Sequence, residues 1–87
     1  MAIPSFQIAT IKGDGIGIDV TDATLAVIDA AQSRVGGFSL RYRQILAGAG
    51  YYQETGLDIE AEGEEMAGAA DAIFLGAIGL PSVRYEN

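Results

Sequence analysis

The sequence contains no cysteine, no histidine and no tryptophan. A chain without cysteine forms no disulfide, no thiolate metal site and no cysteine nucleophile, and its default environment is a reducing cytoplasm. The absence of histidine removes the side chain that most often acts as a general base or as a metal ligand. Composition alone therefore excludes several kinds of catalytic centre.

Basic residues are scarce as well: five lysines and arginines stand against twelve aspartates and glutamates, for a formal net charge of −7. Nucleic acids and anionic membranes bind clustered lysine and arginine, so we expect neither as a partner. No apolar run approaches the roughly 18 residues of a membrane span, and the first residues lack the pattern of a signal peptide. We expect a soluble, cytoplasmic chain.

Apolar residues are abundant, at 49% of 87 positions, which is a globular composition. A chain of this length makes one small domain at most. Runs that are rich in β-branched residues or that alternate strictly predict strands at 6–12, 38–45 and 72–78. Helical periodicity predicts helices at 18–35 and, interrupted by two glycines, at 57–72. The order is β-α-β-α-β.

The helix at 18–35 is predicted to be amphipathic and to end at Gly36 and Gly37. Its apolar face is expected to consist of Val20, Ala23, Val27 and Ala30 or Ala31. In the second strand the alternating side chains of Phe38, Leu40 and Tyr42 are expected to face the core. The stretch 47–56 is predicted from its composition to be a loop.

Strands that alternate with helices predict an α/β fold with a mainly parallel sheet and right-handed crossovers. Ligands of such sheets lie beyond the carboxyl ends of the strands. Two glycine-bearing turns, 13–17 and 76–81, follow strand carboxyl ends, and parallel strands would bring both turns to one edge. This edge is the predicted binding site.

The turn 13–17 reads "GDGIG", and its spacing departs from the common phosphate motifs. A dinucleotide fingerprint needs G-x-G-x-x-G, and a phosphate loop needs Gly-Lys-Ser/Thr, and neither is present. Asp14 would also compete with a bound phosphate. Spacing alone favours a structural turn in which Asp14 caps the following helix. If the turn does contact a nucleotide, Ile16 suits the apolar face of an adenine better than a pyrophosphate.

Taken together, "GDGIG" after a first strand, the amphipathic helix and "DAIFLGAIGLP" around a third strand resemble the isocitrate/isopropylmalate dehydrogenase family. These are the metal-dependent β-decarboxylating dehydrogenases, which include tartrate and malate enzymes. The resemblance implies that residues 1–87 are the N-terminal part of a larger domain, an incomplete β-α-β-α-β segment of a mostly parallel sheet. We therefore expect the isolated segment to be marginally stable, because surface that the rest of the domain would cover is exposed.

The resemblance also implies an NAD site in the parent protein. The isoleucine of the family's glycine turn packs on the adenine, and the loop after the third strand lies beside the nicotinamide. In this sequence the corresponding cofactor-binding residues are Ile16, Ala77, Ile78, Gly79 and Leu80. "GIGIDVT" is closer to isocitrate enzymes, whereas "GAGYYQETG" and "GAIGLP" are closer to the isopropylmalate and tartrate branch, which we favour. The choice between NAD and NADP stays open.

The implied reaction is the oxidation and decarboxylation of a malate-type 2-hydroxy acid, such as 3-isopropylmalate or a tartrate- or malate-like acid, with NAD and Mg²⁺ or Mn²⁺. In the family pattern the substrate-binding arginines, the proton-moving tyrosine and lysine and the metal-binding aspartates lie beyond residue 87. We therefore assign no catalytic and no metal-binding residue to this chain. The resemblance implies a homodimeric parent; the alternative is a small non-catalytic binding or interaction module derived from the same fold.

The remaining notable residues have structural interpretations. One of Tyr51 and Tyr52 is expected to pack and the other to lie at the surface. The acidic run 60–65 is expected to be the solvated face of a helix that Asp58 caps and Asp71 ends.

Overall fold

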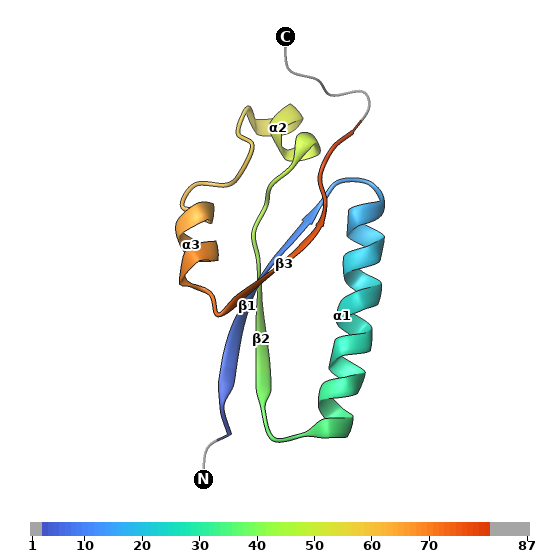
Figure 1. The fold of residues 1–87 in the computed structure, drawn as a ribbon. Coiled ribbons are helices and arrows are strands. Elements are labelled where there is room, and N and C mark those ends of the chain that lie inside the picture. Colours follow the sequence, from blue (N-terminus) through green and yellow to red (C-terminus); the bar gives the residue numbers. More distant parts are fainter. Residues whose placement is uncertain (1–2, 81–87) are drawn as a thin grey trace.

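A computed structural model of the chain describes residues 3–80. It confirms an α/β fold with three strands and three helices (Figure 1). In chain order the elements are β1 (Ser5–Gly13), α1 (Ile16–Val35), β2 (Ser39–Gln44), α2 (Ala49–Thr55), α3 (Gly63–Ala69) and β3 (Ala72–Ala77).

The three strands form one parallel sheet in the order β2-β1-β3, as the alternation of strands and helices predicted. β1 lies in the centre, with Ser5 opposite Ser39 of β2 and Ile8 opposite Ala72 of β3. The predicted strand ranges agree with the observed ones to within one residue at each end. Both neighbours of β1 therefore end at the same edge as β1 does.

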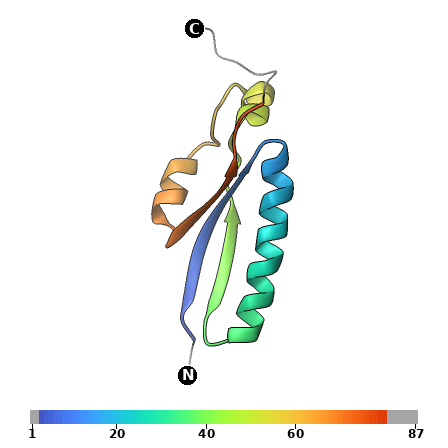
Figure 2. The same ribbon diagram turned by 45° about the vertical axis from the view of Figure 1, so that its right-hand side comes forward.

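The two faces of the sheet are covered by different helices, α1 on one side and α3 on the other (Figures 1 and 2). On the α1 side, the Lys12 ammonium lies 2.8 Å from the Asp22 carboxylate, and the Tyr42 hydroxyl donates to Asp29 across 3.4 Å. The opposite side holds the small apolar core. Its buried residues are Ala9, Ile11 and Ile45, and Ala47, Ile59, Met66, Ala67 and Ala70 pack against them.

The predicted buried face of α1 is wrong. Gly17 and Thr21 are the buried residues of this helix, whereas Val27, placed in the apolar face by its spacing, is 68% exposed. Periodicity identifies an apolar stripe but not its partner, and here the helix approaches the sheet through its smallest residue. The stripe that contains Val20 and Val27 therefore lies at the surface.

The second half of the chain also differs from expectation. The stretch predicted as a loop contains α2, and the long second helix is only the seven residues of α3. Asp58 does not cap α3, because Glu62 stands at that position and makes no side-chain cap. Asp71 follows the end of α3 and joins β3 to β1, since it exchanges two 2.8 Å hydrogen bonds with the backbone of Gln7.

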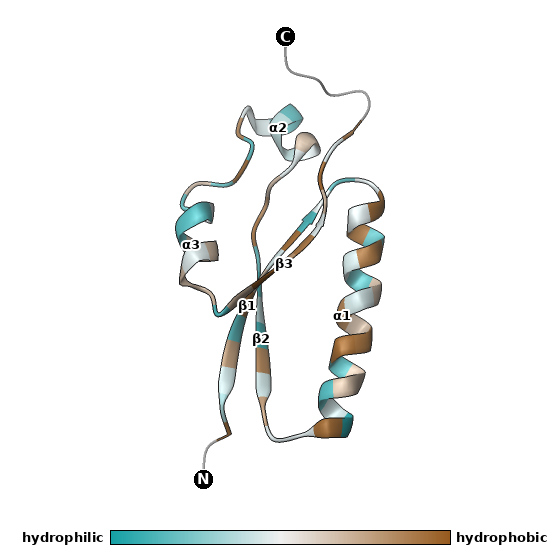
Figure 3. Ribbon diagram, in the orientation of Figure 1, coloured by the Kyte–Doolittle hydropathy of each residue, from teal (hydrophilic) through white to brown (hydrophobic). Residues whose placement is uncertain are grey.

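Large apolar side chains remain at the surface of the described residues, on α1 and on β3. Figure 3 shows that both elements contain strongly hydrophobic residues. Ile73 and Leu75 of β3 are 54% and 58% exposed. They share the sheet face of Ala9 and Ile11, which are their register partners, but α3 does not cover them. The expectation of uncovered apolar surface is therefore confirmed.

Candidate functional site

Two glycine-bearing bends meet at the carboxyl edge of the sheet. The first connects β1 to α1, and the second follows β3. The backbone N–H of Asp14 in the first bend donates to the carbonyl of Ala77 in the second across 2.7 Å. The predicted meeting of the two bends at one edge is confirmed.

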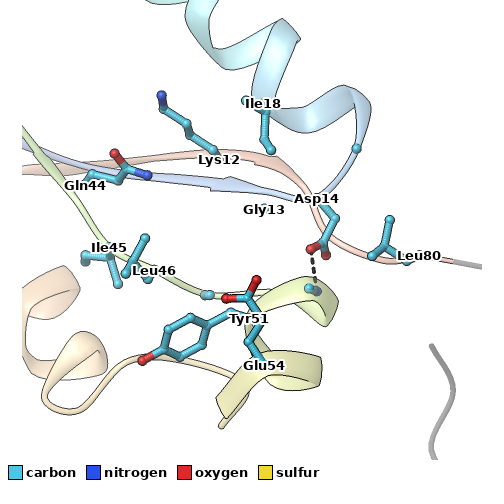
Figure 4. Close-up of a pocket in the computed structure, with 13 residues that line it drawn as sticks. Lys12, Gly13, Asp14, Ile18, Gln44, Ile45, Leu46, Tyr51, Glu54 and Leu80 are labelled. Carbon is cyan, nitrogen blue, oxygen red and sulfur yellow. Dashed lines mark hydrogen bonds between the residues drawn. The ribbon is translucent and has the colours of Figure 1, made fainter. Parts of the chain in front are cut away.

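The same edge holds a crevice between the ends of β1 and β2. The chain leaves β1 toward α1 on one face, and it leaves β2 toward α2 and α3, of which α3 lies on the other face (Figure 2). Segments that diverge in this way open a crevice at the carboxyl ends, which is where open α/β sheets bind ligands. Here the crevice has a volume of about 510 Å³ (Figure 4). It is lined by Lys12, Gly13, Asp14, Gly15, Ile18, Gln44, Ile45, Leu46, Ala47, Gly50, Tyr51, Glu54 and Leu80.

A few polar side chains stand among the apolar walls of this crevice. Lys12 is already paired with Asp22 of α1. Gln44 and Glu54 are exposed and Tyr51 is half-buried, so β2 and α2 contribute three polar residues to the lining of the crevice. Apolar walls with a few polar groups are typical of small-molecule sites, and the volume lies within their usual range of roughly 300–1,000 Å³.

Asp14 is a charged residue that is buried at this edge of the sheet, with 6% of its surface exposed. Its carboxylate accepts backbone N–H groups from Ala49 at 2.7 Å, Gly50 at 2.8 Å and Gly79 at 2.8 Å. Burial by itself raises the pKa of Asp14, but the bonds from Gly50, Gly79 and Ala49 together outweigh it and lower the pKa below its ordinary value. The group is therefore ionised at neutral pH.

The prediction that Asp14 caps α1 is wrong, because α1 begins after Gly15 without any side-chain cap. Asp14 instead serves the start of α2, 35 residues away. Its carboxylate also takes the three N–H groups that a phosphate at this point would need. The expectation that Asp14 opposes a phosphate cradle agrees with this geometry.

The third glycine of "GDGIG" serves the contact between α1 and the sheet. A Cβ atom on Gly17 would lie 2.4 Å from the Lys12 carbonyl oxygen and 2.5 Å from the Ala77 nitrogen. Both neighbours are backbone atoms and cannot rotate away, so this position requires glycine. The motif departs from the dinucleotide spacing because Gly17 packs a helix onto strand ends.

The predicted cofactor residues lie at this edge but not in one cavity. Leu80 lines the crevice beside Asp14, whereas Ile78 and Gly79 line a second hollow of about 440 Å³. Ala77 contributes its carbonyl to the contact with Asp14. Ile16 is 71% exposed and lines neither hollow. Its side chain is thus available to a large ligand that extends across the surface.

Sequence reasoning did not identify the crevice residues contributed by β2 and α2, namely Gln44, Tyr51 and Glu54. The available signal was the carboxyl end of the second strand, which a parallel sheet must place beside the first. No glycine stands directly at this strand end, so the pattern that marks the exits of the other two strands is absent here.

Within residues 3–80, no three acidic side chains gather in a way that would hold a metal ion. The same part of the chain contains no helix that is both long and apolar enough to cross a membrane.

Comparison with known proteins decides the family. Residues 7–87 match the sequence model described as isocitrate/isopropylmalate dehydrogenase. The chain belongs to this family. The resemblance carried by "GDGIG" and "DAIFLGAIGLP" is therefore confirmed.

Two relatives show which members of the isocitrate/isopropylmalate dehydrogenase family the chain is similar to. The chain is 41% identical over 78 residues to a probable tartrate dehydrogenase/decarboxylase of Agrobacterium vitis, covering 90% of this chain and 22% of the relative. It is 40% identical over 87 residues to a 3-isopropylmalate dehydrogenase of Symbiobacterium thermophilum, covering 100% of this chain and 23% of the relative.

A solved structure of the family is also similar. The β-decarboxylating dehydrogenase of Thermococcus kodakarensis, in its apo form, aligns with a TM-score of 0.72 and 32% identity, over 91% of this chain and 22% of that chain. The chain thus spans about a fifth of the length of the relatives that it matches.

Proposed function

We propose that this chain is the N-terminal part of an NAD-dependent, metal-requiring oxidoreductase that oxidises and decarboxylates a malate-type 2-hydroxy acid. 3-Isopropylmalate and tartrate- or malate-like acids are the proposed substrates, which agrees with the names of the relatives. The proposed parent is a cytoplasmic homodimer that uses Mg²⁺ or Mn²⁺. NAD supplies the hydride acceptor and the metal polarises the substrate's oxygens.

The observation that carries the proposal is the contact between the two bends. It places residues 77–80 directly beside the turn 13–17, with the side chain of Ile16 exposed nearby. The chain then supplies part of a cofactor wall: Ile16 for the adenine, and Ala77, Ile78, Gly79 and Leu80 for the nicotinamide end. Among residues 3–80 no group of three or more acidic side chains could hold a metal ion, and we propose that the rest of the parent binds it.

The alternative of a free-standing module is disfavoured by the exposed apolar side chains. Ile73 and Leu75 on the sheet, together with Val27 on α1, leave apolar surface on both sides of this segment. Such surface is typical of an interface rather than of an independent small domain.

The proposal is tested on the natural gene product by following NAD reduction with 3-isopropylmalate, tartrate, malate and isocitrate, each with Mg²⁺ and then with a chelator. We expect metal-dependent reduction with a member of the isopropylmalate and tartrate group. Reduction with none of these acids, by a folded product of family length, would refute the proposal.

The assignment of Ile16 to the adenine is tested by a separate substitution. Ile16→Ala should raise the KM for NAD about fivefold, since one apolar wall of the adenine is lost, at roughly 1 kcal/mol. Val27→Ala is the matched control, because it truncates another exposed apolar residue of α1 away from the edge. An unchanged KM in Ile16→Ala would remove Ile16 from the cofactor wall.

A further inference from the structure

The carboxylate of Asp14 connects three segments that lie far apart in the sequence. Oδ2 accepts the N–H groups of Ala49 and Gly79, and Oδ1 accepts that of Gly50. These donors are 35, 65 and 36 residues from Asp14. An ordinary helix cap serves its own helix, whereas this side chain joins the exits of all three strands.

The surrounding backbone is shaped to the carboxylate. A Cβ atom on Gly48 would lie 2.7 Å and 2.9 Å from the two carboxylate oxygens of Asp14. A Cβ atom on Gly50 would lie 3.2 Å from Oδ1. The glycines of "AGAG" therefore allow the start of α2 to close around the anion, an observation independent of the hydrogen bonds themselves.

Because of where it lies, the Asp14 carboxylate affects both hollows of the candidate site. Asp14 lies between the two hollows: it lines the crevice itself, while its donors Ala49 and Gly79 line the second hollow. Besides Asp14, the charged residues that line these hollows are Lys12, Glu54, Asp58 and Glu64. None of them is hydrogen-bonded to the Asp14 carboxylate, whose partners among the described residues are all backbone N–H groups.

We propose that Asp14 is a positioning residue that sets where residues 77–80 lie relative to the turn 13–17 and the start of α2. The effect on the nicotinamide end of a cofactor rests on the proposed function, but the positioning itself does not. Both carboxylate oxygens are needed, because they accept three donors. In Asp14→Asn one oxygen becomes an NH₂ group, which faces N–H groups and accepts nothing.

Hydrogen exchange followed by mass spectrometry tests the positioning on the natural gene product. In Asp14→Asn, peptides that contain Ala49, Gly50 and Gly79 should exchange about tenfold faster or more, while peptides of α1 and of the β1–β2 ladder stay unchanged. Asp19→Asn is the matched control, since it removes the same charge from an exposed position in the first turn of α1. Unchanged exchange at Gly79 in Asp14→Asn would overturn the proposal.

A measurement on the unmodified protein covers the case in which Asp14→Asn does not fold. In ¹⁵N-labelled protein, the amide signals of Ala49, Gly50 and Gly79 should move together on acidification, with one common midpoint. Three different midpoints, or no movement of Gly79, would show that the segments do not share this carboxylate.

Kinetics connect the positioning to the proposed function. With the nicotinamide end displaced and Ile16 retained, Asp14→Asn should lower kcat about tenfold or more and change the KM for NAD far less. Equal effects on kcat in Asp14→Asn and Asp19→Asn would count against a role at the site. If the unmodified protein reduces no NAD at all, the proposed function fails, and the exchange experiment still decides the positioning.

Discussion

The two ends of the sheet both carry glycine bends, but the bends meet very different surroundings. At the amino end, Gly36 has a φ of 69°, and no atom lies within 4 Å of the place where its Cβ would stand. At the carboxyl end, Gly17 is enclosed by the backbone of Lys12 and Ala77. The glycine at the amino end satisfies local chain geometry, whereas the glycine at the carboxyl end satisfies contacts with β1 and β3.

The difference shows how the two ends depend on the rest of the chain. The amino-end bend depends on its own backbone angles. The carboxyl edge depends on contacts that span up to 65 residues, through Asp14 and Gly79. Substitutions at the carboxyl edge should therefore lower the free energy of unfolding more and should affect more distant residues, and three variants test this. A fourth variant, at Thr21, is expected to have the opposite sign.

The largest effect is expected from Gly17→Ala. The added methyl group meets backbone atoms at 2.4 Å and 2.5 Å, and overpacking of this kind lowers the free energy of unfolding by about 3 kcal/mol. Urea unfolding followed by circular dichroism measures the loss. Gly68→Ala in α3 is the control, because its Cβ meets nothing within 4 Å and alanine favours the helix. Equal effects of the two variants would abolish the contrast between crowded and open glycines.

The second largest effect is expected from Asp14→Asn. This substitution should lower the free energy of unfolding by about 2 kcal/mol at neutral pH, because hydrogen bonds to a charged group are weakened. The pKa of Asp14 is lowered in the folded state, so the contribution of the charge is complete above the unfolded pKa of about 3.9. It is lost as the pH falls through the lower folded pKa. The difference between the two proteins in urea unfolding should therefore shrink below pH 4, and a constant difference down to pH 2 would contradict this assignment.

Gly36→Ala should lower the free energy of unfolding by less, about 1 kcal/mol. Its positive φ is unfavourable for a residue with a Cβ, but no neighbouring atom has to move. Urea unfolding followed by circular dichroism measures this loss as well. A loss as large as that of Gly17→Ala would mean that the amino-end bend is as tightly constrained as the carboxyl edge.

The smallest expected effect is an increase in the free energy of unfolding, and it comes from Thr21→Val. Thr21 is fully buried, and its hydroxyl has no hydrogen-bond partner among the described residues. Thr21→Val keeps the shape and removes an unsatisfied polar atom, so the free energy of unfolding should rise by about 0.5 kcal/mol. A destabilised Thr21→Val protein would indicate that this hydroxyl is satisfied. Thr24→Val, half-buried on the same helix, is the control.

Local patterns were sufficient for the parts of the fold that local physics decides. Alternation and β-branched runs predicted all three strands, and Gly36 with Gly37 predicted the end of α1. The start of α2 was not predictable in this way, because its capping group, Asp14, lies 35 residues earlier. The buried face of α1 was missed for a related reason, since Gly17 brings the helix close to the sheet and turns Val27 outward.

The site was predictable as an edge but not as a cavity. Parallel strands bring the turn at 13–17 and residues 77–80 together whatever their side chains are, so their meeting followed from topology; residue 81 of the predicted second turn lies outside the described residues. The crevice residues Gln44, Tyr51 and Glu54 depend on how α2 is held above the sheet. The start of α2 is bonded to the carboxylate of Asp14, which lies 35 residues earlier and which no local pattern connects to it.

The outer side of β3 has a practical consequence for work with this chain. β1 occupies one side of β3, and among residues 3–80 no strand pairs with the other. The segment 72–78 carries no charge and no proline, and exposed strands of this composition add further copies of themselves. We expect the isolated chain to form thioflavin-positive fibrils as its concentration rises, and a lysine in place of Ile73 to delay their appearance.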